Sequence, residues 1–166
     1  VFIVIVKNYS NVEFIEVPFI ALVKDFKIMK LKNIPTGNSK EDIKTRERII
    51  SDFYYEWKRS NPTQRLFNID LMDYINIRHI SIIETVEHAA RTYLSTLAVL
   101  QLDSILTLAK KVRIVNVKPK DKNQNQFEKM IKMEYNLVGI GKVSLIVGVK
   151  RSNKEKVQYC ITAIKT

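Results

Sequence analysis

A histidine and a carboxylate in this sequence are spaced to share one face of a helix. Glu84 lies four residues before His88, and Arg91 lies three residues after it, in a stretch whose apolar residues follow a helical period. A histidine oriented by a carboxylate can act as a general base towards a ribose hydroxyl. The same spacing also suits an ordinary surface ion pair. The other histidine, His79, lies just before the predicted start of this helix.

Basic and aromatic residues come together in the last two predicted strands. If Ser152–Glu155 forms a four-residue hairpin loop, Gly148 lies opposite Tyr159 and leaves backbone uncovered beside an aromatic ring. Such a face can bind a phosphodiester, stabilise its transition-state charge and supply a phenol for proton transfer. Alternatively, Tyr159 is a half-buried strand aromatic and the lysines form a solvated edge. The basic residues of this face and its rim are Lys142, Lys150 and Arg151.

Positive charge is concentrated at the C-terminal end of the chain. Residues 110–166 contain 14 Lys and Arg against 4 Asp and Glu, a net charge of +10 out of +11 for the whole chain. A basic sheet surface favours an anionic partner, most simply a nucleic-acid backbone. Lys120 and Lys122 lie in a polar loop, residues 119–126, that either contacts phosphate or is merely solvated. The predicted partner is nucleic acid, RNA rather than DNA, with an acidic protein or the rest of a larger polypeptide as the alternatives.

The order of the predicted elements indicates an α+β fold. Helices pack on a C-terminal four-stranded antiparallel β-meander, and additional strands lie at the N-terminus. A capping box begins the first helix at Ser39, and a second one, Ser81 with Glu84, opens a long helix from about residue 82 to 110. The four predicted C-terminal strands are 112–118, 127–137, 142–151 and 156–164.

We expect a single domain over residues 1–166, cut from a longer polypeptide because the chain opens inside a strand-like run. Its predicted parts are N-terminal strands (1–38), a helical part (39–110) and the basic sheet (111–166). Within the first part, the strand runs are 1–7 and 12–24, with a short third piece at 26–32.

The composition excludes several classes of protein. One cysteine, Cys160, cannot form an internal disulfide, which fits a reducing cytoplasm. The apolar runs are far shorter than the roughly 20 residues that span a bilayer, so no membrane partner is expected. The histidine and cysteine spacings give no zinc pattern, and Asp and Glu do not cluster as in magnesium-dependent nucleases. We expect no cofactor and no metal site.

The order of elements, two helices followed by a four-stranded sheet ending in a hairpin with Lys, Arg and Tyr, resembles the barnase, EndoU, colicin and RelE class of small ribonuclease folds. The segments that carry the resemblance are 87–98, 141–151 and 157–162, and they are similar to domains on phage and conjugative-element proteins. The resemblance implies a metal-independent ribonuclease in which His88 is catalytic and Lys150, Arg151 and Tyr159 contact phosphate. Unlike barnase-like enzymes, this chain has no histidine in its last strand.

Three functions therefore remain open from the sequence. The first is an RNA-cleaving or RNA-binding domain of the mobile-element or toxin type, in which His88 or Glu84 with Tyr159 moves protons. The second is a non-catalytic module that binds nucleic acid or an acidic partner. The third is a structural accessory domain. The basic residues assigned to phosphate are Lys142, Lys150, Arg151, Arg91, Lys120 and Lys122.

Overall fold

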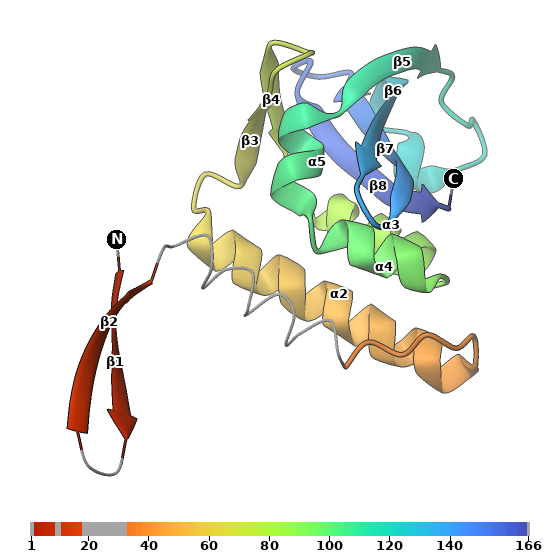
Figure 1. Cartoon of the computed structure of the whole chain (residues 1–166). Helices are drawn as coiled ribbons and strands as arrows, with labels where there is room; N and C mark the ends of the chain where they lie inside the picture. Colours follow the sequence, from red (N-terminus) through yellow and green to blue (C-terminus); the bar gives the residue numbers. More distant parts are fainter. Residues whose placement is uncertain (1, 9–10, 18–32, 166) are drawn as a thin grey trace. The chain divides into compact units, whose positions relative to one another are not determined.

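The computed structural model describes residues 2–8, 11–17 and 33–165, and the chain divides into two compact units, residues 1–34 and 35–166 (Figure 1). In the first unit, β1 (Phe2–Asn8) and β2 (Asn11–Val17) pair as antiparallel strands. The predicted continuation of the second strand beyond residue 17 and the predicted third piece at residues 26–32 lie outside the described residues.

The second unit is α+β, as predicted from the sequence, and it carries the candidate site (Figure 1). Helices and strands alternate in its first half, and strands dominate its second half. Its elements are α2 (Lys40–Ser60), β3 (Arg65–Asn68), β4 (Asp73–Asn76), α3 (His79–Ala89), α4 (Tyr93–Val99), α5 (Leu102–Leu108), β5 (Lys110–Val115), the 3₁₀ turn η1 (Lys122–Gln124), β6 (Phe127–Leu137), β7 (Gly141–Lys150) and β8 (Lys156–Ile164).

The sheet of this unit is mixed and six-stranded in the described residues, with the order β3-β4-β8-β7-β6-β5. The prediction of a four-stranded antiparallel meander is therefore wrong. The strands β5 to β8 are antiparallel neighbours, but the β3–β4 hairpin extends the sheet, and β4 runs parallel to β8 at Asn76 and Val157. Two four-residue strands within a region of helical pattern give too short an alternation to detect.

The β3–β4 hairpin is also fixed to the far side of the sheet. The Asn68 side-chain amide donates to the carbonyl oxygens of Leu106 (2.7 Å) and Ala109 (3.0 Å). The Lys111 backbone amide donates to Asp70 Oδ2 over 2.8 Å. From the sequence, Asn68 and Asp70 suggest helix caps, since Asn and Asp favour such positions. They connect the hairpin to the start of β5 instead.

The predicted long helix over residues 82–110 is three helices, α3, α4 and α5. Its start is also different, because α3 begins at His79 and Ser81 Oγ accepts from the Arg78 backbone amide (2.9 Å). Thr92 then caps α4 by accepting from the Ser95 backbone amide (3.2 Å). A threonine that caps a new helix interrupts the preceding one, because its own backbone leaves the helical region.

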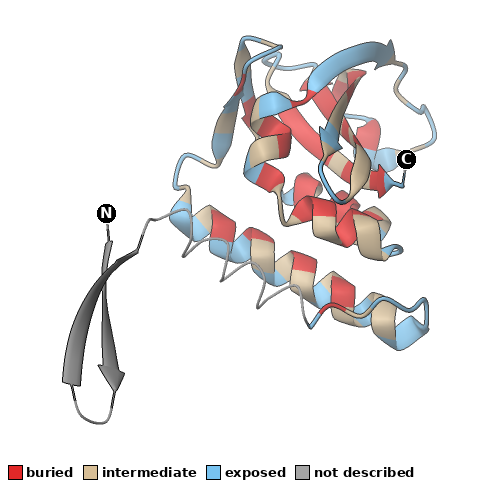
Figure 2. Cartoon of the chain, viewed as in Figure 1, coloured by how far each residue is buried: buried red, intermediate tan, exposed pale blue. Residues whose placement is uncertain are grey.

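The capping box at Ser39 does begin α2, with reciprocal hydrogen bonds between Ser39 and Asp42. The buried face of α2 includes Ile50, Tyr54 and Trp57, as the helical spacing predicts. Figure 2 shows the buried residues gathered where the helices meet the sheet. One face of the sheet is thus covered by helices, and the chemistry must be sought on its other face or at its edges.

The C-terminal part of β8 lies at a sheet edge that helices cover. Beyond Asn76, no described strand pairs with the outer side of β8. The Ser95 hydroxyl accepts from the Ala163 backbone amide (2.9 Å) and lies 3.3 Å from the Ala163 carbonyl oxygen, to which it can also donate. Helices α3 and α4 both contact β8 and therefore protect this strand edge.

Candidate functional site

The register of the last hairpin differs from the prediction. Ile146 pairs with Cys160, whereas Val147 pairs with Gln158, so Tyr159 is an extra residue in a β-bulge. The hairpin turn is also shifted by one residue from the prediction, because the Lys150 backbone amide donates to the Glu155 carbonyl (2.9 Å). The consequence is that Cys160 lies on the face that was expected to carry Ile161.

Gly148 is not an open approach for a ligand. It pairs with Val157 and not with Tyr159, and a Cβ at this position would lie 2.6 Å from the Phe127 ring. The rings of Phe127 and Tyr159 pack edge to face with centroids 6.0 Å apart. The space beside Gly148 is therefore filled by Phe127, which is fully buried.

A cavity of about 450 Å³ lies between α3, the loop after β5 and the sheet. Its lining includes all three predicted catalytic residues, Glu84 and His88 from α3 and Tyr159 from β8. Two features position them. The i,i+4 spacing places Glu84 and His88 on the same side of α3, and the bulge turns Tyr159 towards that helix.

The Glu84 carboxylate is held by two neighbours. One oxygen, Oε1, accepts from the Asn123 side-chain amide over 2.6 Å, and the other, Oε2, lies 3.5 Å from His88 Nε2. The Glu84 side chain is 5% exposed, and that of His88 is 40% exposed. A buried carboxylate thus lies within ion-pair distance of an imidazole that reaches solvent, a pairing in which a histidine can act as a base.

Tyr159 is a hydrogen-bond donor in this cavity. Its hydroxyl donates to Asp121 Oδ2 over 3.2 Å, and the same oxygen accepts from the Gln124 side-chain amide (3.1 Å). Burial raises the pKa of Tyr159 above its ordinary value, and the nearby Glu84 carboxylate raises it further. The phenol therefore stays protonated at neutral pH and cannot serve as a base there.

Cys160 lines the same cavity as a protonated thiol. Burial raises its pKa to about 12, and the charge of Glu84 acts in the same direction. Since the thiolate is the nucleophilic form, Cys160 contributes an apolar wall and no nucleophile at neutral pH.

The loop before β6 supplies the part of the cavity that the sequence does not identify. Asp121 Oδ1 accepts from the Asn123 backbone amide (3.0 Å), and the Gln124 side chain accepts from the Lys118 backbone amide (2.9 Å). These bonds fold the loop over the sheet and bring Lys118, Asp121 and Asn123 into the lining. The amide-rich segment 121–126 is a signal for such a self-bonded loop, although it does not reveal what the loop contacts.

The six predicted phosphate-binding residues lie elsewhere, and the lining of this cavity includes none of them. Lys150 is 3.0 Å from Glu155, and Arg91 is 3.4 Å from Glu87. Lys150 therefore does not line the cavity that His88 and Tyr159 share. Three others are exposed in the connections between strands: Lys120, Lys122 and Arg151.

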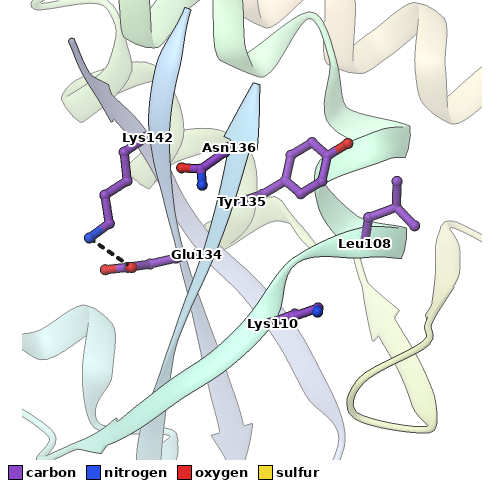
Figure 3. Close-up of a pocket in the computed structure, with 6 residues that line it drawn as sticks. All are labelled: Leu108, Lys110, Glu134, Tyr135, Asn136 and Lys142. Atoms are coloured by element: carbon purple, nitrogen blue, oxygen red, sulfur yellow. Dashed lines mark ion pairs between the residues drawn. The ribbon is translucent and has the colours of Figure 1, made fainter. Parts of the chain in front are cut away.

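Lys142 lines a second cavity, also about 450 Å³ (Figure 3). Its ammonium group lies 2.9 Å from Glu134 Oε2, and the other Glu134 oxygen lies 3.1 Å from Lys132 Nζ. These contacts lower the pKa of the Glu134 carboxyl below its ordinary value. The cavity is lined by Leu108, Lys110, Glu134, Tyr135, Asn136 and Lys142.

The face of the sheet that lines the His88 cavity has opposed like charges. Arg113 lies directly opposite Lys132, and Lys132 lies opposite Ile146, which lines the His88 cavity. Like charges directly opposite each other destabilise a strand pair unless an anion lies near them. Glu134 already pairs with Lys132 and Lys142, so part of this charge is neutralised within the chain, and Arg113 and Lys110 add positive charge beside it.

The described residues contain neither a metal-binding cluster nor a membrane-spanning helix. No group of three or more His, Cys, Asp or Glu is placed to hold a metal ion. No helix there is long and apolar enough to cross a bilayer. The chain matches no protein-family model, and comparisons with curated proteins and with solved structures give no match.

Proposed function

We propose that this chain is an RNA-binding domain that cleaves RNA without a metal, in the cavity between α3 and β8. The single observation that supports this most is that Glu84, His88 and Tyr159 line one cavity although they come from two distant parts of the sequence. The resemblance to small metal-independent ribonucleases, in domains carried on mobile elements, agrees with the proposal. The lone free thiol, Cys160, is consistent with a cytoplasmic location.

In the proposed reaction, neutral His88 removes the proton of a ribose 2′-hydroxyl. The resulting oxygen attacks the adjacent phosphorus, the bond from phosphorus to the 5′ oxygen breaks, and a 2′,3′-cyclic phosphate forms. The 5′ oxygen leaves with a proton and becomes a hydroxyl. Glu84 holds the imidazole and stabilises the imidazolium, which can deliver its proton to solvent or to the leaving oxygen.

Tyr159 and Lys118 act on the phosphate in this proposal. The buried, protonated phenol of Tyr159 donates to Asp121 in the free chain, and in the proposed reaction it turns this hydrogen to the phosphoryl oxygen as negative charge develops. Lys118, in the cavity lining, adds a cation near the same oxygens. The opposed pair Arg113 and Lys132 then contacts neighbouring phosphates along the sheet.

The test is to incubate the purified chain with a 5′-labelled single-stranded RNA in the presence of a chelator. We expect products that end in a 2′,3′-cyclic phosphate, and no cleavage at a position whose sugar is 2′-deoxy. RNA that stays intact at high protein concentration, under conditions where it is bound, would contradict the catalytic part.

The second candidate is a non-catalytic nucleic-acid module, and the opposed cations Arg113 and Lys132 favour it independently of the cavity. This candidate predicts RNA binding that weakens steeply as salt rises, with no products at any time. The same incubation therefore separates the two candidates.

A further inference from the structure

The outer face of the β3–β4 hairpin presents two exposed aromatic rings. Phe67 and Tyr74 lie directly opposite each other and are 39% and 42% exposed. The opposite face of the same hairpin is covered, since Ile75 is fully buried in the core. Burying these two rings would recover hydrophobic free energy that the fold leaves unused.

The geometry of these rings suits a flat, polar ligand group. Their centroids are 5.4 Å apart, and the planes meet at 77°, so the rings pack edge to face and are not stacked in parallel. The guanidinium carbon of Arg65 lies 4.2 Å from the Tyr74 centroid. One face of Tyr74 is thus covered by the planar guanidinium. A base that stacks on this face would replace Arg65 there, and the displaced arginine would remain nearby as positive charge for a phosphate.

The hairpin face continues the face that carries the His88 cavity. Asn76 pairs with Val157, so their side chains share a face, and Tyr74 is two residues before Asn76. Tyr159 is two residues after Val157 in the parallel strand. Strand geometry therefore separates Tyr74 from Tyr159 by about 14 Å, from about 3.3 Å per residue and about 5 Å between strands.

We propose that Phe67 and Tyr74 stack on unpaired bases of the RNA strand whose phosphodiester lies in the His88 cavity. This inference rests on the RNA-binding part of the proposed function. Positive charge on this face, from Arg65, Arg113 and Lys132, favours a polyanion with exposed bases over an apolar peptide. The predicted ligand is a single strand, because bases in a duplex are stacked on each other and do not offer their faces.

The test measures binding of a fluorescent 12-nucleotide single-stranded RNA by anisotropy, with His88→Ala in every protein so that no cleavage occurs. We expect the double variant Phe67→Leu/Tyr74→Leu to bind at least about 10-fold more weakly. Leucine keeps an apolar contact across the strands but removes both rings, together with the Tyr74 hydroxyl. The slope of affinity against salt should not change, because stacking releases no counterions.

The matched control is Met72→Ala, on the same hairpin, whose side chain is 73% exposed but has no ring. We expect its affinity for the single strand to stay within about twofold of the parent. We also expect the parent and all variants to bind a duplex of the same sequence with equal affinity. Equal single-strand affinity of parent and Leu/Leu variant would overturn the stacking site. An equal loss in Met72→Ala would overturn it too, because the hairpin would then be a general apolar docking surface.

The outcomes also separate this inference from the proposed catalysis. Weaker binding by the Leu/Leu variant, combined with an absence of cleavage by the unmodified chain, would leave the stacking site supported and remove the nuclease. Absence of RNA binding by the parent at low salt would overturn both.

Discussion

Replacing His88 with alanine should lower the rate of RNA cleavage about 100- to 10,000-fold, the range that a positioned general base contributes. The reason is that His88 is the exposed partner of a buried carboxylate inside the cavity, with its Nε2 atom 3.5 Å from Glu84 Oε2. The measurement is the single-turnover rate constant at saturating protein, with chelator present, so that a change in binding does not enter the result.

His79→Ala provides the matched control for this prediction. His79 is exposed at the first turn of the same helix and lies outside the cavity lining. Its replacement should leave the rate constant within about twofold of the unmodified chain. A His88→Ala protein that cleaves at the parental rate would remove the histidine from the reaction.

Replacing Arg46 with alanine should lower the free energy of unfolding by about 3 kcal/mol or more. Arg46 is fully buried. Its guanidinium donates to backbone carbonyls of two segments, the one that precedes α2 and the one that follows α3. Nε donates to the Ala90 oxygen (2.7 Å), and Nη1 donates to those of Pro35 (2.8 Å) and Gly37 (2.6 Å). Alanine would leave several buried acceptors without a donor, at a cost of about 1–3 kcal/mol each.

Urea unfolding followed by circular dichroism measures this effect. Arg48→Ala, exposed on the same helix, should change the free energy of unfolding by less than about 0.5 kcal/mol. Arg46→Lys keeps the charge but not the planar set of donors, so its stability should lie between those of the parent and Arg46→Ala. A stability loss in Arg46→Ala no larger than in Arg48→Ala would show that these carbonyls find other donors. Because Ala90 follows α3 directly, Arg46 also helps fix the helix that carries Glu84 and His88.

Much of the architecture follows from local patterns in the sequence. The capping box at Ser39, the alternation in β6 and the turn residues around β8 are short-range signals, and each predicts an element that the structure contains. The i,i+4 pair of Glu84 and His88 is local in the same sense, since helix geometry alone brings the two side chains together.

The remaining features depend on contacts between distant segments. Nothing in residues 156–164 requires Tyr159 to be a bulged residue, because the bulge is set by how β8 pairs with β7. The hairpin of β3 and β4 is held by hydrogen bonds from Asn68 to the carbonyls of Leu106 and Ala109, which lie about 40 residues further along the chain. The folded loop that delivers Lys118 and Asn123 likewise depends on tertiary contact with Glu84.

We expect RNA to occupy the cavity beside His88, and the two histidines of the chain allow binding there to be told apart from binding elsewhere. The measurement is an NMR titration of both imidazole rings with a 2′-O-methylated RNA strand, which lacks the attacking hydroxyl. We expect the His88 ring signals to shift progressively to saturation, while those of His79 stay in place. Saturable RNA binding that leaves the His88 signals unmoved would show that RNA does not occupy this cavity.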